Sequence, residues 1–317
     1  MTIILAGSYP PGTLEKFKTY LPNAEFIEVH DQNDYDTLDR GDLIVVRVLK
    51  TTKETIQSKK SLKGIIRWGA GYDSVDIEAA GTAGIFVAVT PGANAYAVSE
   101  LAVGLMVAIG RKLTFQSEMT RNGSWDQSLK SSEMTTLNKK TVGILGIGNI
   151  GKGVAKIVQT FGASVVYYDA LRLEESLEKQ LEIKYVSFLE LIRTSDVISV
   201  HIPLMENTYH IISDAEFEEM KNDVIIINTA RGGVIDEMAL AKAIQSGKVL
   251  GAGLDCVENE NMTTNPLNKL DNVIITPHIG GTSNDIAYEM IPRIGNQLLK
   301  FSETGTVDYI VNKAFLG

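Results

Sequence analysis

The residues whose types and spacing most clearly suggest chemistry begin with three glycines in the middle of the chain. Gly146, Gly148 and Gly151 form a GxGxxG motif directly after the apolar run 142–145. In such a motif the first glycine permits a tight turn, the second lets a diphosphate approach the backbone, and the third lets a helix pack on the strand. The amides and positive dipole at the start of that helix favour an anion. Glycine-rich turns also occur as ordinary turns between elements, so the motif alone is compatible with either a dinucleotide site or a simple turn.

Two neighbouring features favour a dinucleotide site. An apolar face at helical spacing follows the motif, and the next strand, residues 164–168, ends in Asp169. Asp169 lies 18 positions after Gly151, close to the ~20 at which an acidic residue receives the adenosine ribose. A carboxylate there accepts hydrogen bonds from the ribose diol and repels a 2′-phosphate, which predicts NAD rather than NADP. The alternative is a turn-forming aspartate at a strand end.

Residues suited to proton transfer follow later apolar runs. Arg231, Glu258, Glu260 and His278 each come shortly after such a run. A cofactor that moves a hydride needs a partner that moves a proton, and histidine titrates near neutrality. A carboxylate paired with the histidine would raise its pKa, and an arginine can hold an acid substrate with its two-pronged edge. Each residue also has an ordinary alternative as a loop histidine, a surface arginine or a solvated acid.

The elements that must position these residues alternate between strand and helix patterns. Such alternation favours parallel sheets with helices on both faces. The first part predicts strands at 3–6, 25–29, 43–46, 65–68 and 85–89, and helices at 14–21 and 51–62. The second predicts a helix at 174–181 and strands at 164–168, 183–186, 196–201, 223–228, 249–254 and 272–276. We therefore expect an α/β protein with two doubly wound, Rossmann-like domains.

The second series lies between two parts of the first domain. We expect residues 1–95 and 284–317 to form a substrate domain and residues 96–283 an NAD-binding domain, with a last helix from about 284 to 301. Two crossings predict a cleft between the domains, where hinge closure can exclude water. Residues 94–121 are expected to form one long helix, and its apolar first half should be buried between domains or subunits.

A small-residue loop, residues 69–73, follows the predicted strand at 65–68. Ligands of open α/β sheets bind at the carboxyl ends of strands. The bare amides of Gly69 to Gly71 could hold a carboxylate there, and a simple tight turn is the alternative. Arg67, just before the loop, and Arg47 could meet a phosphate, with a salt bridge as the alternative for each.

Bulk composition excludes several function classes. The 317 residues leave room for two hydrophobic cores, and 44% hydrophobic with 22% charged residues is typical of globular proteins. A net charge of −9 argues against nucleic-acid and anionic-membrane partners. The apolar stretches at 3–6 and 101–110 are too short for a signal peptide or a membrane span. A single cysteine is consistent with a reducing cytoplasm, and no histidine spacing suggests a metal site.

Five segments make the chain recognisable. They are GILGIGNIGKGVAK, HIPLMENT, INTARGGVIDEMAL, GAGLDCVENE and TPHIGG, in this order. The chain resembles the D-isomer-specific 2-hydroxyacid dehydrogenases, a family that includes D-3-phosphoglycerate dehydrogenase, glyoxylate/hydroxypyruvate reductase and D-lactate dehydrogenase. The resemblance runs nearly end to end. It implies reversible hydride transfer between NAD(H) and C2 of a D-2-hydroxy acid, and we expect a cytoplasmic homodimer assembled through the helix near 94–121.

The resemblance also implies roles for single residues. Arg231 would bind the substrate, Glu260 would pair with the histidine, and His278 would donate and accept the proton. The family's glutamate lies five positions after the aspartate of its GLD segment, which selects Glu260 over Glu258. The implied substrate-binding residues are Arg67, Ala70, Gly71, Asn94 and Arg231. The implied cofactor-binding residues are Gly146, Gly148, Asn149, Ile150, Gly151, Asp169, His201, Pro203, Thr208, Thr229, Ala230, Asp255, His278 and Gly280.

The chain departs from the family pattern in two places. The family often has a proline directly after the glutamate, where this chain has Asn261. The sequence ends soon after its last predicted helix, so we expect no regulatory serine-binding tail of the longer phosphoglycerate dehydrogenases. The resemblance favours 3-phosphoglycerate as substrate, then glyoxylate or hydroxypyruvate. A non-catalytic NAD-sensing protein, like the corepressors that resemble this family, would keep the same cofactor site and is the alternative of another class.

Overall fold

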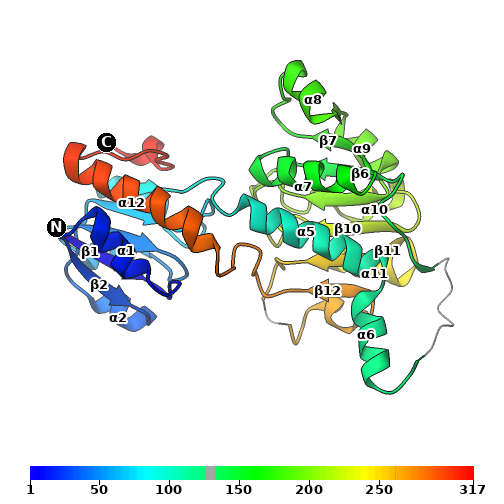
Figure 1. Cartoon of the computed structure of the whole chain (residues 1–317), viewed down its shortest axis with the longest axis horizontal. Coiled ribbons are helices and arrows are strands. Elements are labelled where there is room, and N and C mark those ends of the chain that lie inside the picture. Colours follow the sequence, from blue (N-terminus) through cyan, green and yellow to red (C-terminus); the bar gives the residue numbers. More distant parts are fainter. Residues whose placement is uncertain (126–132, 261) are drawn as a thin grey trace. The chain divides into compact units, whose positions relative to one another are not determined.

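The chain folds into two compact units in a computed structural model that describes residues 1–125, 133–260 and 262–317. Asn261, at the place of the family's proline, lies outside the described residues. Unit 1 comprises Met1–Asn94 with Thr282–Gly317, and unit 2 comprises Ala95–Gly281 (Figure 1). These bounds differ by one or two residues from those expected from the sequence.

Unit 1 is built on a parallel five-stranded sheet with strand order β2-β1-β3-β4-β5. The chain order reverses between β1 and β3, which makes the sheet doubly wound. Its strands are β1 (Thr2–Ala6), β2 (Glu25–Val29), β3 (Leu43–Val46), β4 (Gly64–Arg67) and β5 (Phe86–Ala88). Its helices are α1 (Thr13–Tyr20), α2 (Gln32–Thr37), α3 (Lys53–Ser58), α4 (Ile77–Thr82), α12 (Ile286–Thr304) and the short 3-10 helix η3 (Lys313–Phe315).

Both faces of this sheet are buried. Ile3 and Leu5 point into a core shared with α1 and α12, whereas Ile4 and Ala6 point into a core shared with α2, α3 and α4. Side chains alternate between the faces of a strand, so a strand covered on both sides reads as an unbroken apolar run. That is why β1 and β3 were recognisable from sequence.

Unit 2 is built on a parallel seven-stranded sheet with strand order β12-β11-β10-β9-β6-β7-β8. Its strands are β6 (Thr141–Leu145), β7 (Ser164–Tyr168), β8 (Ile183–Tyr185), β9 (Val197–Val200), β10 (Val224–Asn228), β11 (Val249–Leu254) and β12 (Val273–Ile275). Its helices are α5 (Ala95–Gly110), α6 (Leu113–Arg121), α7 (Asn149–Thr160), α8 (Glu175–Leu181), α9 (Phe188–Thr194), α10 (Asp214–Glu219), α11 (Glu237–Gln245) and η2 (Pro266–Lys269).

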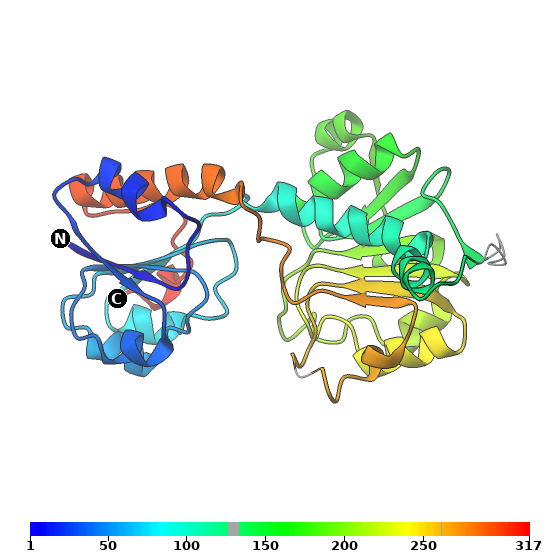
Figure 2. The same ribbon diagram turned by 60° about the horizontal axis from the view of Figure 1, so that its bottom comes forward.

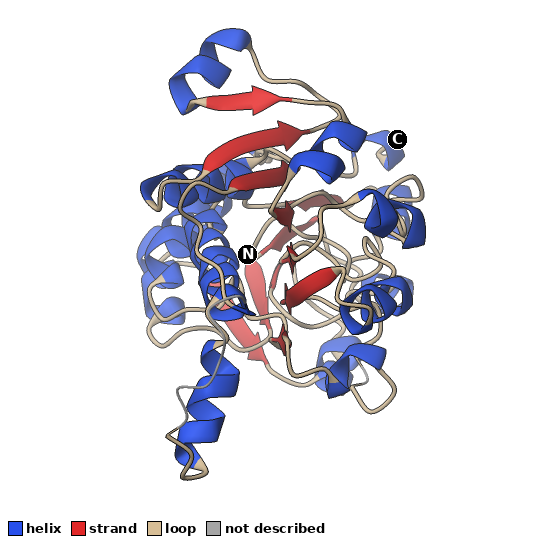
Figure 3. Cartoon of the chain, turned by 90° about the vertical axis from the view of Figure 1, so that its right-hand side faces the viewer, coloured by secondary structure: helices blue, strands red, loops and turns tan. Residues whose placement is uncertain are grey.

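The order of these strands is that of a dinucleotide-binding sheet, which reverses between β6 and β9. Helices α5 and α7 pack on one face, and α9, α10 and α11 pack on the other. Figure 2 shows the strands of this unit between the two helical layers, and Figure 3 shows the same layers end-on. Because parallel strands all end at one edge, the loops after β6, β9, β10, β11 and β12 share that edge.

The expectation of one long helix over residues 94–121 is wrong. The structure has two helices there, α5 and α6, and the break falls at Lys112. Lys112 has a φ of 51°, the left-handed conformation that an α-helix cannot contain. The amide of Thr135 donates to the carbonyl oxygen of Gly110 at the end of α5, a contact from a later part of the chain that the local pattern does not reveal.

Other expected helix bounds shift by a few residues. The helix expected at 51–62 is the shorter α3, whose N-cap Thr52 accepts a hydrogen bond from the amide of Thr55. The last helix, expected from about 284 to 301, runs from Ile286 to Thr304 and stops at Gly305, which has a φ of 71°. Within the described ranges, no helix combines the length and apolar character that a membrane crossing requires.

Candidate active site

The glycine motif forms the turn between β6 and α7, and its glycines meet different surroundings. Gly146 has a φ of 97°, and a Cβ on it would lie 2.8 Å from the backbone of His201. A Cβ on Gly151 would collide with the carbonyl oxygen of Gly146, so close packing of α7 on the turn requires glycine there. Gly148 instead faces open space, because a Cβ on it would meet nothing within 4 Å. The middle glycine therefore leaves bare backbone available to a ligand.

The start of α7 is suited to an anion. Gly148 is the N-cap residue and has no side chain to accept hydrogen bonds from the first amides of the helix. The first amides of a helix have no partner within it, so those of Asn149 and Ile150 remain for a ligand. The helix is 12 residues long and directs its positive dipole end to this point.

Asp169, directly after β7, is attached to the glycine turn. Its Oδ2 accepts a hydrogen bond from the amide of Ile147 at 2.8 Å, and its Oδ1 accepts one from the amide of Leu171 at 3.1 Å. The side chain is half-buried. The structure therefore places the residue predicted to bind the ribose beside the turn predicted to bind the diphosphate.

Two further predicted cofactor residues have buried polar atoms that find no hydrogen-bond partner in the described part of the chain. These atoms are Nδ1 of His201 and Oγ1 of Thr229. The other ring nitrogen of His201 lies 2.8 Å from Ser199 Oγ, and burial lowers the pKa of His201 to about 3, so the ring is neutral. An unpaired buried polar atom is costly, and polar groups of a ligand would satisfy it. With the bare turn and Asp169, these atoms fit NAD at this edge.

Other predicted cofactor residues already have partners within the protein. Thr208 Oγ1 donates to the carbonyl oxygen of Pro203 at 2.7 Å and accepts from the amide of Met205 at 2.7 Å, which fixes the loop after β9. The amide of Ala230 donates to Asn228 Oδ1 at 3.0 Å. The Thr208 side chain and the Ala230 amide therefore shape the loops at this edge of the sheet, whether or not they touch a cofactor.

Asp255, after β11, organises the loop that carries His278. Its carboxylate is buried and accepts hydrogen bonds from Thr276 Oγ1 at 2.6 Å and from the amides of Ile279 and Gly280 at 2.8 and 2.7 Å. Its carbonyl oxygen accepts from the amide of His278 at 3.0 Å. His278 is thereby held at a φ of 53°, a conformation that is uncommon for a residue other than glycine. This positioning role was not foreseen from sequence, which placed Asp255 only beside the cofactor.

Glu260 and His278 line one cavity of about 460 Å³ in unit 2. Hydrophobic side chains form much of the remaining wall, among them Val257, Met262 and Leu267. Both polar side chains are exposed, and no hydrogen bond joins them in the part of the chain that the structure describes. The structure therefore brings the predicted acid and the predicted proton donor to one cavity, while their direct pairing stays a prediction.

Arg231 is placed by close packing of its turn. Its Nη1 donates to the carbonyl oxygen of Ala230 at 2.6 Å, and Asn228 Nδ2 donates to the carbonyl oxygen of Arg231 at 2.8 Å. A Cβ on Gly232 would collide with the backbone of Val257, so this turn lies against the segment that leads to Glu260. Arg231 is half-buried and does not belong to the residues that line the cavity.

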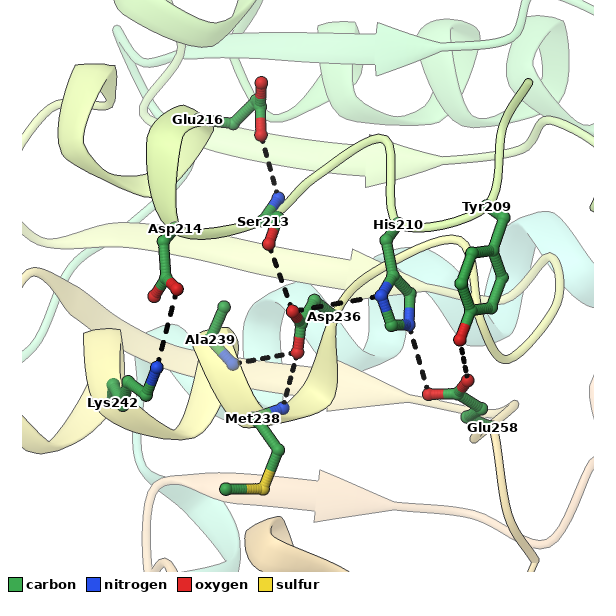
Figure 4. A network of polar contacts seen from close by, with 10 residues as sticks. All are labelled: Tyr209, His210, Ser213, Asp214, Glu216, Asp236, Met238, Ala239, Lys242 and Glu258. Carbon is green, nitrogen blue, oxygen red and sulfur yellow. Dashed lines mark hydrogen bonds and ion pairs between the residues drawn. The ribbon is translucent and has the colours of Figure 1, made fainter. Parts of the chain in front are cut away.

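A polar network also holds the segment that leads to Glu260 (Figure 4). Glu258 accepts a hydrogen bond from the Tyr209 hydroxyl at 2.7 Å and lies 3.2 Å from Nε2 of His210. Nδ1 of His210 lies 3.8 Å from Asp236, and the rings of Tyr209 and His210 stack with centroids 3.9 Å apart. Both oxygens of Glu258 are thus engaged in holding the loop, whereas Glu260 faces the cavity. This geometry supports the choice of Glu260 as the acid.

Glu237 binds two further residues in and after the segment that leads to Glu260. Its carboxylate accepts hydrogen bonds from the amide of Glu258 and, at 2.7 Å, from Asn265 Nδ2. Burial raises the pKa of Glu237, although these two hydrogen bonds oppose the shift. No sequence motif identified Glu237, Glu258 and His210 as a group, because Glu237 begins α11 whereas the other two come from separate loops.

In unit 1, only some backbone amides of the loop after β4 are available to bind a substrate carboxylate. The amide of Gly69 donates to Thr90 Oγ1 at 2.8 Å and to the carbonyl oxygen of Arg67 at 2.9 Å. The expectation that Gly69 helps to hold a carboxylate is therefore wrong, because its amide is already used. The amides of Ala70 and Gly71 donate no hydrogen bond within the described ranges. Asn94 is half-buried and directly precedes α5.

The two arginines considered for phosphate binding both bind backbone. Arg67 Nη1 donates to the carbonyl oxygens of Val46 at 3.1 Å and Trp68 at 3.3 Å, and also to that of Arg47. Arg47 Nη1 donates to the carbonyl oxygen of Ser8 at 2.6 Å. Both guanidinium groups therefore tie together the loops at the carboxyl edge of the sheet in unit 1.

Comparisons with known proteins agree with this geometry. Residues 103–280, more than half of the chain, match the family described as D-isomer specific 2-hydroxyacid dehydrogenase, NAD binding domain. The chain is 37% identical to a glyoxylate reductase of Thermococcus litoralis, over 86% of this chain and 84% of that protein. It is 42% identical to a hydroxypyruvate reductase of Thermotoga maritima, over 81% and 85%. It is also 42% identical to a D-3-phosphoglycerate dehydrogenase of Archaeoglobus fulgidus, over 76% of this chain but 46% of that protein.

Solved structures confirm the predicted fold of two Rossmann-like domains. A glyoxylate reductase from Paecilomyes thermophila matches with a TM-score of 0.87 at 32% identity, over 98% of both chains. An acyclic imino acid reductase in complex with NADPH and D-Arg matches with a TM-score of 0.85 at 27% identity, over 98% of this chain and 100% of that one. The chain therefore belongs to the D-isomer specific 2-hydroxyacid dehydrogenases and is an NAD-dependent oxidoreductase of that family.

Proposed function

We propose that this enzyme interconverts a small, unphosphorylated 2-oxo acid, such as glyoxylate or hydroxypyruvate, and the corresponding 2-hydroxy acid. When bound, NADH would supply the hydride to C2, and NAD would accept it in the reverse direction. The observation that carries the proposal is the cavity shared by Glu260 and His278, in which Asp255 fixes the backbone that presents the histidine.

Each proposed role follows from the chemistry of the side chain. In the reducing direction C2 gains a hydride, and the carbonyl oxygen takes the proton that protonated His278 releases. Glu260 stabilises the charged imidazolium before transfer. Arg231 offers two parallel donors to the substrate carboxylate and polarises the keto oxygen. The amides of Ala70 and Gly71 supply further donors to the carboxylate.

The engagement of Arg47 and Arg67 supports an unphosphorylated substrate. The family resemblance alone favoured 3-phosphoglycerate, which would need cationic groups directed at a phosphate. Instead, both guanidinium groups donate to backbone carbonyl oxygens. The match covers most of the length of two relatives cited above, which are named glyoxylate reductase and hydroxypyruvate reductase. It covers 46% of the length of the D-3-phosphoglycerate dehydrogenase. 3-Phosphohydroxypyruvate remains the second candidate.

A panel of oxo acids tests the proposal. NADH consumption would be followed by absorbance with glyoxylate, hydroxypyruvate and 3-phosphohydroxypyruvate at equal ionic strength. We expect kcat/KM for one of the first two to exceed that for the phosphorylated acid by about tenfold or more, the effect of one unmatched charged group. A clear preference for 3-phosphohydroxypyruvate would contradict the proposal, and no turnover with any 2-oxo acid would contradict the reaction class.

We also propose a homodimer that uses α5 and α6. No side chain of α6 is buried within its own chain, and Leu113, Met119 and the following Trp125 are exposed. Exposed large apolar side chains on an element with no buried residue support a protein interface there. Light scattering after size-exclusion chromatography should give a dimeric mass that Met119→Glu reduces, and a monomeric natural protein would contradict the arrangement.

A further inference from the structure

A second charged residue lies close to Asp169, and it is bound to another part of the protein. Arg172 comes three residues after Asp169, in the segment between β7 and α8. Its Nε donates to Glu178 Oε1 at 2.8 Å and its Nη2 donates to Glu178 Oε2 at 2.8 Å. Such a two-pronged pair fixes the guanidinium in one orientation, against α8.

Glu178 is itself firmly held. It is 6% exposed, and its Oε1 also accepts a hydrogen bond from the buried Tyr167 hydroxyl at 2.6 Å. Tyr167 in turn accepts from the amide of Leu173 at 3.0 Å. Hydrogen bonds from Arg172 and then from Tyr167 lower the pKa of Glu178 to about 2, so its charge persists over the whole physiological pH range.

Arg172 is nevertheless exposed to solvent. Its side chain is 57% exposed, and its guanidinium lies 5.2 Å from the centroid of the Tyr185 ring. The residue before it, Leu171, donates its amide to the Asp169 carboxylate, which also binds the glycine turn through Ile147. Arg172 is therefore the cation nearest in sequence to the group proposed to receive the adenosine ribose.

The fold can accept a cofactor with a 2′-phosphate, because the acyclic imino acid reductase of the same fold binds NADPH. In dinucleotide sheets an arginine near the ribose site accommodates that phosphate. We propose that Glu178 withholds Arg172 from the cofactor, so that the Arg172–Glu178 pair and Asp169 together make the enzyme select NAD over NADP. The proposal rests on the ribose role of Asp169 and extends it to a second pair of residues.

The charges explain the direction of the effect. While Glu178 is ionised, the pair is neutral and two of the donors of Arg172 are occupied. A 2′-phosphate would then meet the negative charge of Asp169 without a compensating charge from Arg172. If Glu178 loses its charge, Arg172 carries an uncompensated positive charge and donors in a fork that matches a phosphate.

Glu178→Gln tests the proposal in the full-length protein. Dissociation constants for NADH and NADPH would be measured by calorimetry. NADPH affinity should rise about tenfold, as expected for a charge-assisted hydrogen bond, and NADH affinity should change less than about twofold. The gain should shrink as the salt concentration increases, because the new attraction is electrostatic.

Two control variants separate this mechanism from a general change in charge. Glu219→Gln also removes one carboxylate and releases an arginine of the same unit, Arg193, which it binds at 2.7 Å. It should leave the ratio of the two affinities unchanged. In the double variant Glu178→Gln with Arg172→Met, the gain for NADPH should disappear.

The outcomes are decisive. Unchanged NADPH affinity in folded Glu178→Gln, or a gain that survives in the double variant, would overturn the proposal. If Glu178→Gln does not fold, Arg172→Lys keeps the charge at an exposed position without the two-pronged pair, and it must then raise NADPH affinity. Asp169→Ala tests the ribose role separately. If that variant keeps the natural NAD preference while Glu178→Gln shifts it, the ribose role of Asp169 is wrong, the joint selection is overturned, and only the effect of the Arg172–Glu178 pair is retained.

Discussion

The carbonyl oxygen of Asp255 accepts a hydrogen bond from the amide of His278 at 3.0 Å, while the carboxylate of the same aspartate binds the two residues that follow. One buried side chain thus holds the proposed proton donor in a left-handed backbone conformation. Because the ring of His278 has no partner among the described side chains, its position depends on this backbone.

Asp255→Asn should impair both stability and turnover. The amide group of asparagine presents a donor where the protein supplies only donors, so at least one hydrogen bond is lost. We expect a loss of about 1–3 kcal/mol in the free energy of unfolding, typical of an unsatisfied buried group, and a lower kcat. Denaturant unfolding and steady-state kinetics would measure both. Thr276→Val, which removes one of the donors, should show a smaller effect in the same direction, and equal stability in both variants and the natural enzyme would refute this account.

His278→Ala should abolish most turnover while cofactor binding stays nearly intact. General acid–base catalysis typically contributes about 10²–10⁴-fold, and the side chain lines the cavity rather than the glycine turn. Calorimetric titration with NADH would give the affinity, and the absorbance assay would give kcat. Full activity in this variant would contradict the proposed mechanism.

The glutamates of the same loop should behave differently. Glu260→Gln should lower kcat, because the proposed proton donor loses a negative neighbour that stabilises its charged form. Glu258→Gln should mainly lower the melting temperature, because it weakens the contacts with Tyr209 and His210. Comparison of kcat with the melting temperature of each variant distinguishes the two glutamates, and the reverse pattern would show that Glu258 is the catalytic acid.

Asp169→Ala should weaken NADH binding and relax discrimination against NADPH. The substitution removes the proposed acceptor for the ribose and the negative charge that repels a 2′-phosphate. It also removes the hydrogen bond to Ile147, so part of the loss comes from a looser glycine turn. Leu171→Ala, which keeps the carboxylate, is the control. An unchanged ratio of the two affinities would show that Asp169 does not bind the ribose.

Local patterns in the sequence were sufficient for the family and the fold. Buried parallel strands appear in the sequence as apolar runs. Gly146, Gly148 and Gly151 lie in one short turn, so their spacing along the chain is enough to identify it. The resemblance added the choice of Glu260 over Glu258, and the structure supplies a physical reason for it, because both oxygens of Glu258 are engaged elsewhere.

Features that depend on distant contacts were missed. The break at Lys112 needs a left-handed residue that no local pattern marks. The use of the Gly69 amide by Thr90 joins residues 21 positions apart. Arg172 and Tyr167 both donate to Glu178, and no motif in the sequence marks this contact.

The neutral ring of His201 has a consequence for how the enzyme responds to acidity. A histidine whose pKa is lowered to about 3 carries no positive charge at any pH at which enzymes usually work. The diphosphate end of the cofactor would then be held by amides and the dipole of α7, none of which titrate. Acidification within that range would therefore leave His201 uncharged, so the way this residue meets the cofactor would not change.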